Sequence, residues 1–290
     1  MNSTSKGTEF YLKQSLRCGN KMLNIAKPLV MGILNVTPDS FYSGSRYVRH
    51  ETLMEAALQM ASEGVAILDI GAVSSRPGAA AVSEAEELRR LIPVVEELAL
   101  SFPDIVLSID TFRAAVAAKA IESGAHIIND ISAGELDPAM FETIAGLGVP
   151  YIMMHMQGTP DLMQSNPVYN DVVKDIIAYF ERRLEKLCHY GAASVLLDPG
   201  FGFGKTILQN YEILRRLNEF TAMGLPMVAG LSRKSMIYKI LNSTPEQALT
   251  GTTVLNSLAL LNGANILRVH DVREAVETIK LMDVYKNKPD

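Results

Sequence analysis

Polar side chains stand directly after short apolar runs in this sequence, and some of them are suited to binding a neutral heterocycle. Asp110, Asn129 and Asp198 each follow such a run. A buried carboxylate requires a hydrogen-bond donor or a positive charge as its partner. Two carboxylates and an amide therefore suit a heterocycle that offers several N–H groups. An alternative for Asp110 is that it caps the helix expected after Thr111; we interpret both aspartates as binding residues.

Basic side chains follow apolar runs in the same way. Lys234, Arg268 and His270 stand at or just beyond the ends of such runs, and Arg76 lies in an adjoining loop. A lone lysine or arginine is usually a solvated surface residue, and a lone histidine is more often structural. Four such groups brought together would instead bind an anionic group, and phosphate is the group that we expect.

A glycine-rich stretch follows the apolar run that ends at Asp198. Residues 198–205 read DPGFGFGK, so proline and glycine break the chain at once and allow a ligand to approach the backbone closely. The stretch is not a Walker phosphate loop, because position 199, where that motif requires its first glycine, is proline. The cysteine and histidine spacings fit no structural zinc site either.

The apolar runs alternate with segments of helical periodicity from residue 29 onward. Each run is too short for a helix and leads into polar residues, which is typical of buried parallel strands. Eight such strand–helix units in one domain predict an α/β fold of the TIM type, a (β/α)8 barrel whose polar strand ends converge on one mouth. A doubly wound open sheet is the alternative. The expected strands are 29–34, 65–68, 105–109, 126–128, 151–154, 195–197, 226–229 and 265–267, and the expected helices are 51–63, 84–100, 113–123, 138–147, 170–190, 208–218, 246–262 and 272–285.

The segments before the first barrel strand set the domain boundary. Residues 10–27 are expected to form a short hairpin with its turn at 18–21. We therefore divide the chain into an N-terminal extension, residues 1–27, and a single barrel domain, residues 28–290. Within the barrel domain, Pro93 lies inside an expected helix and should kink or restart it.

Composition and charge limit the partners. The net charge is −5 and no basic stripe stands out, so we expect no nucleic-acid partner. No apolar stretch reaches the length of a membrane span, and the first 27 residues lack the hydrophobic region of a secretory signal. Cys18 and Cys188 form neither a metal-ligand cluster nor a disulfide framework. These features predict a cytoplasmic protein without a membrane partner.

Several segments together resemble the dihydropteroate synthase family, in order from about residue 29 to the end of the chain. They are 32–41 (GILNVTPDSF), 108–111 (SIDT), 129–131 (NDI), 198–205 (DPGFGFGK), 232–235 (SRKS) and 268–271 (RVHD). The resemblance implies a barrel enzyme of folate synthesis. Such an enzyme joins 4-aminobenzoate to 6-hydroxymethyl-7,8-dihydropterin diphosphate, and releases diphosphate with the assistance of Mg2+.

The resemblance also implies roles for individual residues. The residues that would bind or lie against the pterin are Asp110, Asn129, Met154, Asp198, Phe203 and Lys234. Asn35 would help to bind Mg2+, while Arg268 and His270 would hold the diphosphate. The loop that would close over the aminobenzoate contains Ser75, Arg76 and Pro77, and Ser235 would contact the aminobenzoate carboxylate. The residues expected to take part in catalysis are Asn35, Arg76, Lys234, Arg268 and His270.

The mechanism implied is substitution at the methylene carbon of the pterin. Mg2+ and the basic groups would stabilise the departing diphosphate. The extended pterin can delocalise the positive charge that develops, so the aromatic amine requires positioning more than a strong base.

Two loops depart from the pattern of the family. Positions 42–45 read YSGS where the family commonly carries Ser-Asp-Gly-Gly, so a loop carboxylate is absent. Positions 71–78 read GAVSSRPG where the family commonly carries Gly-Gly-Glu-Ser-Thr-Arg-Pro-Gly, so Val73 replaces a glutamate. These changes concern loop closure, Mg2+ and aminobenzoate more than pterin binding.

Two alternative functions use the same pterin site. A pterin-dependent methyltransferase of related barrel type would have no use for Arg268, His270 and Asn35 as a diphosphate site. A pterin-binding protein without catalysis would fit the two altered loops. Competition by diphosphate distinguishes these alternatives from a synthase. The resemblance further implies a homodimer, for which we expect the last helices to form the interface.

Overall fold

The computed structural model describes residues 15–36, 46–73, 82–158, 167–191 and 194–286. Eight parallel strands form its centre. They are β3 (Leu29–Asn35), β4 (Ile67–Gly71), β5 (Val106–Asp110), β6 (Ile127–Asp130), β7 (Tyr151–Met154), β8 (Val195–Asp198), β9 (Val228–Ala229) and β10 (Ile266–Val269). The strands neighbour one another in the order β8-β7-β6-β5-β4-β3-β10-β9.

A short contact between β8 and β9 completes the ring. Leu197 forms an isolated parallel bridge with Met227, and its N–H donates to the carbonyl of Pro226 at 2.8 Å. The sequence prediction of a TIM-type (β/α)8 barrel is therefore confirmed, and the open-sheet alternative is wrong.

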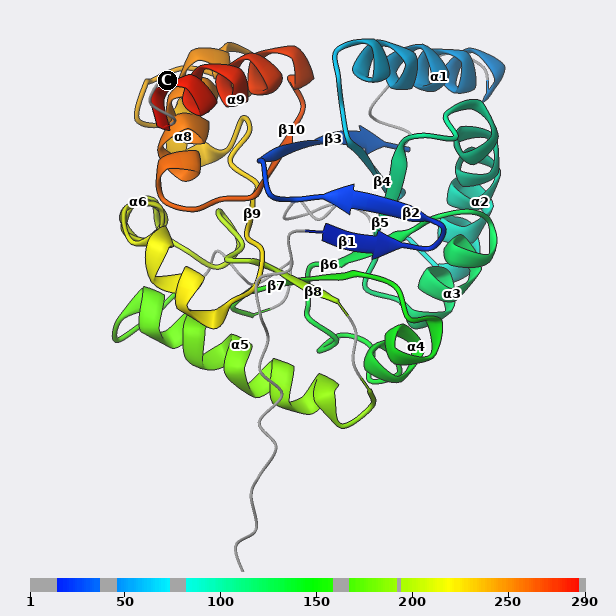
Figure 1. Cartoon of the computed structure of the whole chain (residues 1–290), viewed down its shortest axis with the longest axis horizontal. Helices are drawn as coiled ribbons and strands as arrows, with labels where there is room; N and C mark the ends of the chain where they lie inside the picture. The colour runs from blue at the N-terminus through cyan, green and yellow to red at the C-terminus, as the bar shows by residue number, and fades with distance from the viewer. Residues whose placement is uncertain (1–14, 37–45, 74–81, 159–166, 192–193, 287–290) are drawn as a thin grey trace, which may run out of the picture.

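Helices surround the strand ring in Figure 1. The α-helices are α1 (Arg46–Ser62), α2 (Glu84–Ser101), α3 (Ala114–Glu122), α4 (Met140–Leu147), α5 (Val172–Cys188), α6 (Ile207–Arg215), α7 (Ser235–Tyr238), α8 (Leu249–Leu261) and α9 (Val272–Lys286). Two 3-10 segments, η2 (Leu217–Met223) and η3 (Pro245–Gln247), precede β9 and α8.

Helices α2, α5 and α6 begin at side chains that accept from their first N–H groups. Asp171 caps α5 by accepting from the N–H groups of Val173 and Lys174. Thr206 and Gln209 form a reciprocal capping box at the start of α6. Each helix then buries an apolar stripe against the strands, so local sequence and packing favour the same element.

The helix around Pro93 differs from the sequence prediction. α2 runs without interruption from Glu84 to Ser101, so the predicted restart is wrong. Pro93 lies on the exposed face of α2, as does Arg89, whose carbonyl group proline cannot pair. Water can bond that carbonyl, which lets the helix continue.

The amino-terminal end of the barrel is closed by a hairpin. Strand β1 (Ser15–Cys18) pairs antiparallel with β2 (Lys21–Asn24) through a turn at Gly19, which adopts a φ of 64°. The predicted hairpin is confirmed, and Figure 1 shows it lying across the strand ring. Its apolar residues pack against the first inward-facing residues of the barrel strands. This apolar plug consists of Leu16, Cys18, Leu23, Ile25, Met31, Ile67, Val106, Ile127, Ile152, Leu196, Val228 and Ile266.

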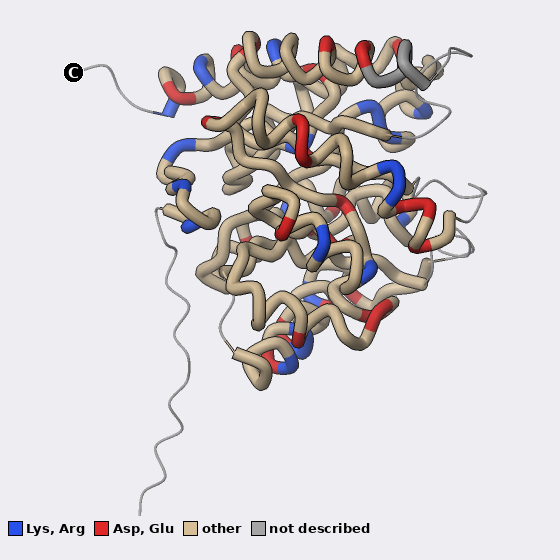
Figure 2. Tube along the Cα trace, turned by 90° about the vertical axis from the view of Figure 1, so that its right-hand side faces the viewer, with Lys and Arg blue, Asp and Glu red and all other residues tan. Residues whose placement is uncertain are grey.

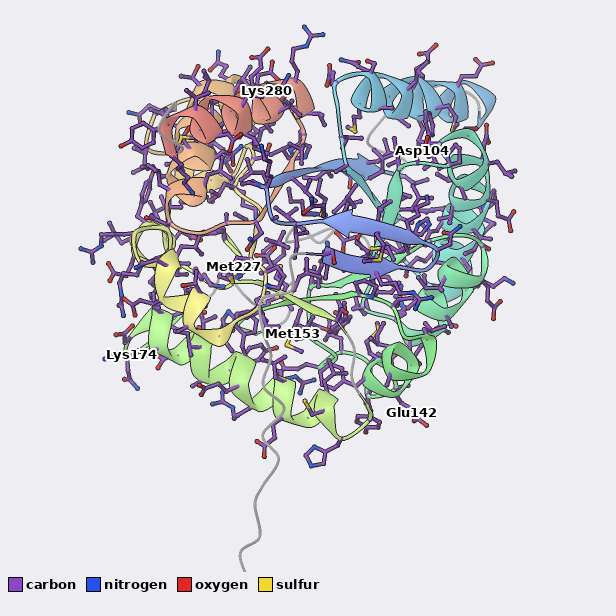
Figure 3. The ribbon with its side chains drawn as sticks, in the orientation of Figure 1. Asp104, Glu142, Met153, Lys174, Met227 and Lys280 are labelled. Atoms are coloured by element: carbon purple, nitrogen blue, oxygen red, sulfur yellow. The ribbon has the colours of Figure 1, made fainter. Side chains whose placement is uncertain are left out.

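A larger core lies between the strands and the helices. Figure 3 shows Met153 and Met227 inside the molecule, whereas Glu142, Lys174 and Lys280 project from its outer helices. Lysine and arginine are interspersed with aspartate and glutamate along the chain in Figure 2. None of the helices in the described ranges combines the length and apolarity that a membrane crossing requires.

Candidate active site

The predicted polar residues meet at the carboxyl end of the barrel because the parallel strands end in register. Asn35 pairs with Gly71, Gly71 with Asp110, and Asp110 with Asn129 in successive strands. Asp198 ends β8, and Arg268 lies within β10. The prediction that polar residues at the ends of the parallel strands meet at the carboxyl end of the barrel is thus confirmed for these residues.

Arg268 forms the centre of a buried ionic network. Its Nε donates to Asp69 Oδ2 at 2.6 Å, and its terminal amino group donates to Asp110 Oδ2 at 2.7 Å. Asp69 also accepts from Ser108 Oγ at 2.7 Å and from Asn129 Nδ2 at 3.1 Å. A buried carboxylate with several donors is held rigidly, so Asp69 fixes residues from three other strands.

Asp69 was not among the residues selected from the sequence. It lies inside β4 and not at its end, although it is a carboxylate within an apolar run like Asp110 and Asp198. An acidic residue inside a buried strand must have a buried partner, and this signal could have identified it.

The helix-capping alternative for Asp110 is wrong. Arg113 occupies the N-cap of α3, and the N–H of Ala114 donates instead to Asp137 Oδ2 at 2.7 Å. Burial raises the pKa of Asp110 to about 7, the Arg268 guanidinium opposes this rise, and Asp69 adds to it. Asp110 therefore belongs to the network at the mouth.

Asp198, Lys234 and Arg268 converge around Gly230. A Cβ atom at Gly230 would lie 3.7 Å from Lys234 Nζ, 3.8 Å from Asp198 Oδ2 and 4.0 Å from Arg268 Cβ. Burial raises the pKa of Asp198, and Lys234 opposes that rise. Burial lowers the pKa of Lys234 to about 8, and Asp198 opposes that fall. The acidic Asp198 and the basic Lys234 thus face one another beside Gly230, which carries no side chain.

An apolar wall adjoins these charges. Met154 lies in a small cluster with Ile131 and Met156, and Phe203 packs against that cluster. Lys234 Nζ lies 4.8 Å from the centroid of the Phe203 ring and donates to the carbonyl of Phe201. An apolar wall beside paired polar groups is suited to a flat heterocycle with polar edges.

The loop after β9 is tied to the end of β10. Ser232 Oγ lies 3.0 Å from His270 Nδ1 and accepts from the His270 N–H at 3.2 Å. Arg233 donates to both carboxylate oxygens of Asp271. These contacts hold His270 close to the loop that carries Lys234 and Ser235, the first residue of α7.

Asn35 is the residue predicted to bind Mg2+. A Cβ atom at Gly71 would lie 3.8 Å from Asn35 Oδ1 and 3.4 Å from Asp110 Cβ, so Asn35 lies at the same mouth. Within the described ranges, no group of three or more histidine, cysteine, aspartate or glutamate residues could hold a metal ion. A single amide oxygen fits an Mg2+ ion that takes its remaining ligands from phosphate and water.

The loop that the resemblance assigns to aminobenzoate lies outside the described residues. This applies to Ser75, Arg76 and Pro77, and also to the altered positions 42–45. The described start of the second altered loop is Ala72, which is fully buried, and Val73.

The comparisons with known proteins agree with this site. The chain matches the family of pterin binding enzymes over residues 31–270. A barrel with hydrogen-bonding carboxylates and buried cations at its mouth, matched in this way, is a pterin-binding enzyme.

Individual proteins that resemble this chain over most of its length are named dihydropteroate synthase. The chain is 45% identical over 266 residues to the dihydropteroate synthase of Escherichia coli K12, covering 90% of this chain and 93% of that protein. The dihydropteroate synthase of Yersinia pestis with a sulfonamide drug has a TM-score of 0.89 at 44% identity, covering 94% of this chain and 99% of that one. The dihydropteroate synthase of Xanthomonas albilineans with 4-aminobenzoic acid has a TM-score of 0.89 at 39% identity, covering 95% and 99%. The chain belongs to the dihydropteroate synthase family of transferases.

Proposed function

We propose that this transferase condenses 4-aminobenzoate with 6-hydroxymethyl-7,8-dihydropterin diphosphate to give 7,8-dihydropteroate and diphosphate. The convergence of Asp198, Lys234 and Arg268 around Gly230 is the observation that carries this proposal. It places hydrogen-bond acceptors for a heterocycle next to cations for a phosphate group.

The pterin lies against the carboxylates and the apolar wall. Asp110, Asn129 and Asp198 accept from or donate to its ring edge, and Lys234 donates to it. Met154 and Phe203 cover its face, which is supported by their shared cluster. Arg268 bonds Asp110 directly and is linked to Asn129 through Asp69, so the site is organised before the substrate binds.

The diphosphate lies beside Arg268 and His270. Asn35 would help to hold Mg2+ near it, and the ion would supply positive charge to the leaving group. The bond from the methylene carbon to oxygen breaks with its electron pair passing to diphosphate. The aminobenzoate nitrogen then bonds to the carbon and loses a proton. Arg268 and His270 stabilise the negative charge that accumulates on the departing group.

The second substrate uses the loop after β4 and the start of α7. Ser75, Arg76 and Pro77 close over 4-aminobenzoate, and Ser235 contacts its carboxylate. The structure of the Xanthomonas albilineans relative contains 4-aminobenzoic acid, which supports 4-aminobenzoate as the second substrate.

The experiment that tests this function is diphosphate release with Mg2+, in the presence and absence of 4-aminobenzoate. Release coupled to dihydropteroate formation supports the synthase. Tight pterin binding without diphosphate release would identify a non-catalytic binding protein. The altered loops would then explain the absence of catalysis. Pterin binding that diphosphate does not inhibit would favour the methyltransferase alternative.

We also propose that the enzyme is a cytoplasmic homodimer whose interface lies on the last helices. Exposed apolar side chains lie on α8 and α9 and just after α7, and α8 packs against both α7 and α9. They are Ile240, Leu241, Val254, Leu258, Leu261, Leu281, Val284 and Tyr285. Such a patch is typical of a surface between subunits. Both cysteines are free thiols, which fits a reducing compartment.

Sedimentation at several protein concentrations tests the dimer. Val254→Glu and Leu281→Glu should each produce monomers, whereas Leu100→Glu, at an exposed position on α2, should leave the dimer intact.

A further inference from the structure

Lys205 is a buried lysine that the proposed reaction does not use. Its side chain follows the loop after β8, and the residue is 3% exposed. Its Nζ donates to the carbonyl oxygens of Phe203 at 2.8 Å, Gly200 at 2.9 Å and His155 at 3.3 Å. It also lies 3.0 Å from His155 Nδ1. Because an ammonium group only donates, these acceptors surround it with suitable partners.

The loop around Lys205 depends on glycines at positive φ. Gly200, Gly202 and Gly204 have φ values of 68°, 83° and 63°. A Cβ atom at Gly200 would lie 1.9 Å from the His155 carbonyl oxygen, and one at Gly204 would lie 2.5 Å from that of Gln157. The loop is therefore pressed against the segment that follows β7, with two of its carbonyl groups directed at Lys205.

The same loop carries groups of the pterin site. The loop is bonded to Asp198, because the Gly200 N–H donates to Asp198 Oδ1 at 2.7 Å. Its Phe201 carbonyl accepts from Lys234, and its Phe203 ring lies beneath Lys234 Nζ. A change in loop shape would displace these groups together.

We propose that Lys205 is a positioning residue whose buried side chain holds the loop 199–204 in the shape that presents Asp198 and Phe203 to the pterin. This inference rests on the proposed function, because it concerns the same pterin. Lys205 acts through the loop and touches no substrate.

The charge of Lys205 acts on Asp198 within a small set of ionisable groups. Asp198 faces Lys234 from the loop after β9, Arg268 from β10 and Lys205. Lys205 in turn faces Asp198, Lys234 and the His155 imidazole from the end of β7. Among the described residues, the ionisable rings of Tyr169 and Tyr179 also lie against His155. Burial lowers the pKa of both His155 and Lys205.

Removing the charge of Lys205 should raise the pKa of Asp198, since Lys205 is one of the cations that lower it. Pterin affinity that depends on the Asp198 carboxylate would then be lost at a higher pH. A loop that was merely loosened would lose affinity equally at every pH, so the pH profile separates the two effects.

The test uses Lys205→Met, Lys205→Gln and the matched control Lys21→Met in the full chain. Lys21 also donates to a backbone carbonyl, that of Ile105 at 2.6 Å, and burial also lowers its pKa, but it lies at the opposite end of the barrel. Binding of 6-hydroxymethylpterin is measured by calorimetry across pH. Circular dichroism and thermal unfolding establish that each variant is folded, and Lys205→Gln decides the matter if Lys205→Met does not fold.

Lys205→Met should weaken pterin binding roughly tenfold or more, the cost of hydrogen bonds from a charged donor. Lys205→Gln keeps donors and should weaken it less, and both should shift the acid loss of affinity to higher pH. Lys21→Met should change neither property. If the Lys205 variants bind the pterin with unaltered affinity, or with an unshifted pH profile, the inference about Lys205 is overturned and the proposed function is not. If the unchanged chain does not bind the pterin, the proposed function and the inference are both overturned.

Discussion

The two ends of the barrel are built from different interactions. At the amino-terminal end, the hairpin β1–β2 and the first strand residues form an apolar plug without ion pairs among its members. At the carboxyl end, Arg268, Asp69 and Asp110 form a buried ionic network. Burial of apolar surface stabilises the fold, whereas buried charges are favourable only while every partner is present.

This difference indicates how stability and function are divided. The contribution of the plug to stability is distributed over many contacts, so the plug can lose one methyl group and still exclude water. The network cannot lose one member without leaving another charge unpaired. We therefore expect changes in the apolar plug to affect folding alone, and changes in the Arg268–Asp69–Asp110 network to affect folding and pterin binding together.

The largest effect should come from Arg268→Ala. It leaves Asp69 and Asp110 buried without their cation, which should lower the free energy of unfolding by about 3–5 kcal/mol, and it should abolish diphosphate release. Urea unfolding and the release assay measure the two effects. Undiminished stability would show that the network at the mouth does not hold the fold.

Leu16→Ala tests the closed end. Leu16 is buried in the plug, so the cavity left behind should lower the free energy of unfolding by about 2–4 kcal/mol. Pterin affinity of the folded variant should equal that of the unchanged chain. A fall in affinity would break the proposed separation between the two ends.

Lys234→Ala should act mainly on binding. It removes a charged donor beside Asp198, and should weaken pterin binding by about 1.5–3 kcal/mol, as calorimetry would measure. Lys239→Ala, at the exposed end of the same short helix, is the matched control. Equal losses in the two variants would contradict a specific role for Lys234.

Arg76→Ala should separate the substrates. We expect it to raise the KM for 4-aminobenzoate while leaving pterin affinity close to that of the unchanged chain, because Arg76 belongs to the loop over the second substrate. Steady-state kinetics and calorimetry measure the two quantities. Equal effects on both ligands would count against this division of roles.

The smallest effect concerns pH. Because burial lowers the pKa of Lys234 to about 8, its ammonium loses a proton as the pH rises through that value, and pterin affinity should fall there. Lys234→Arg keeps its charge over this range, so its affinity, although lower, should no longer fall. If the pterin affinity of Lys234→Arg still falls over this pH range, a different ionisable group causes the fall.

Much of the fold follows from short-range patterns in the chain. Short apolar runs between helical segments predicted the barrel strands and their order, and glycine at position 19 marked the hairpin turn. Pro93 did not restart the helix as one of the two predicted outcomes required, because the consequence of a proline depends on which side of the helix faces water.

The sequence by itself determined that polar residues follow parallel strands, and geometry then requires them to meet at one mouth. Only the tertiary structure decided which of them pair. Arg268 bonds Asp69 across 199 residues and Asp110 across 158, and no local period encodes such a contact. The sequence showed only that Lys205 does not belong to a Walker phosphate loop, whereas the structure shows that its ammonium donates to the backbone carbonyls of Gly200 and Phe203. Periodicity decides which face of an element is buried, whereas the partner of a buried charge depends on the packing of distant strands.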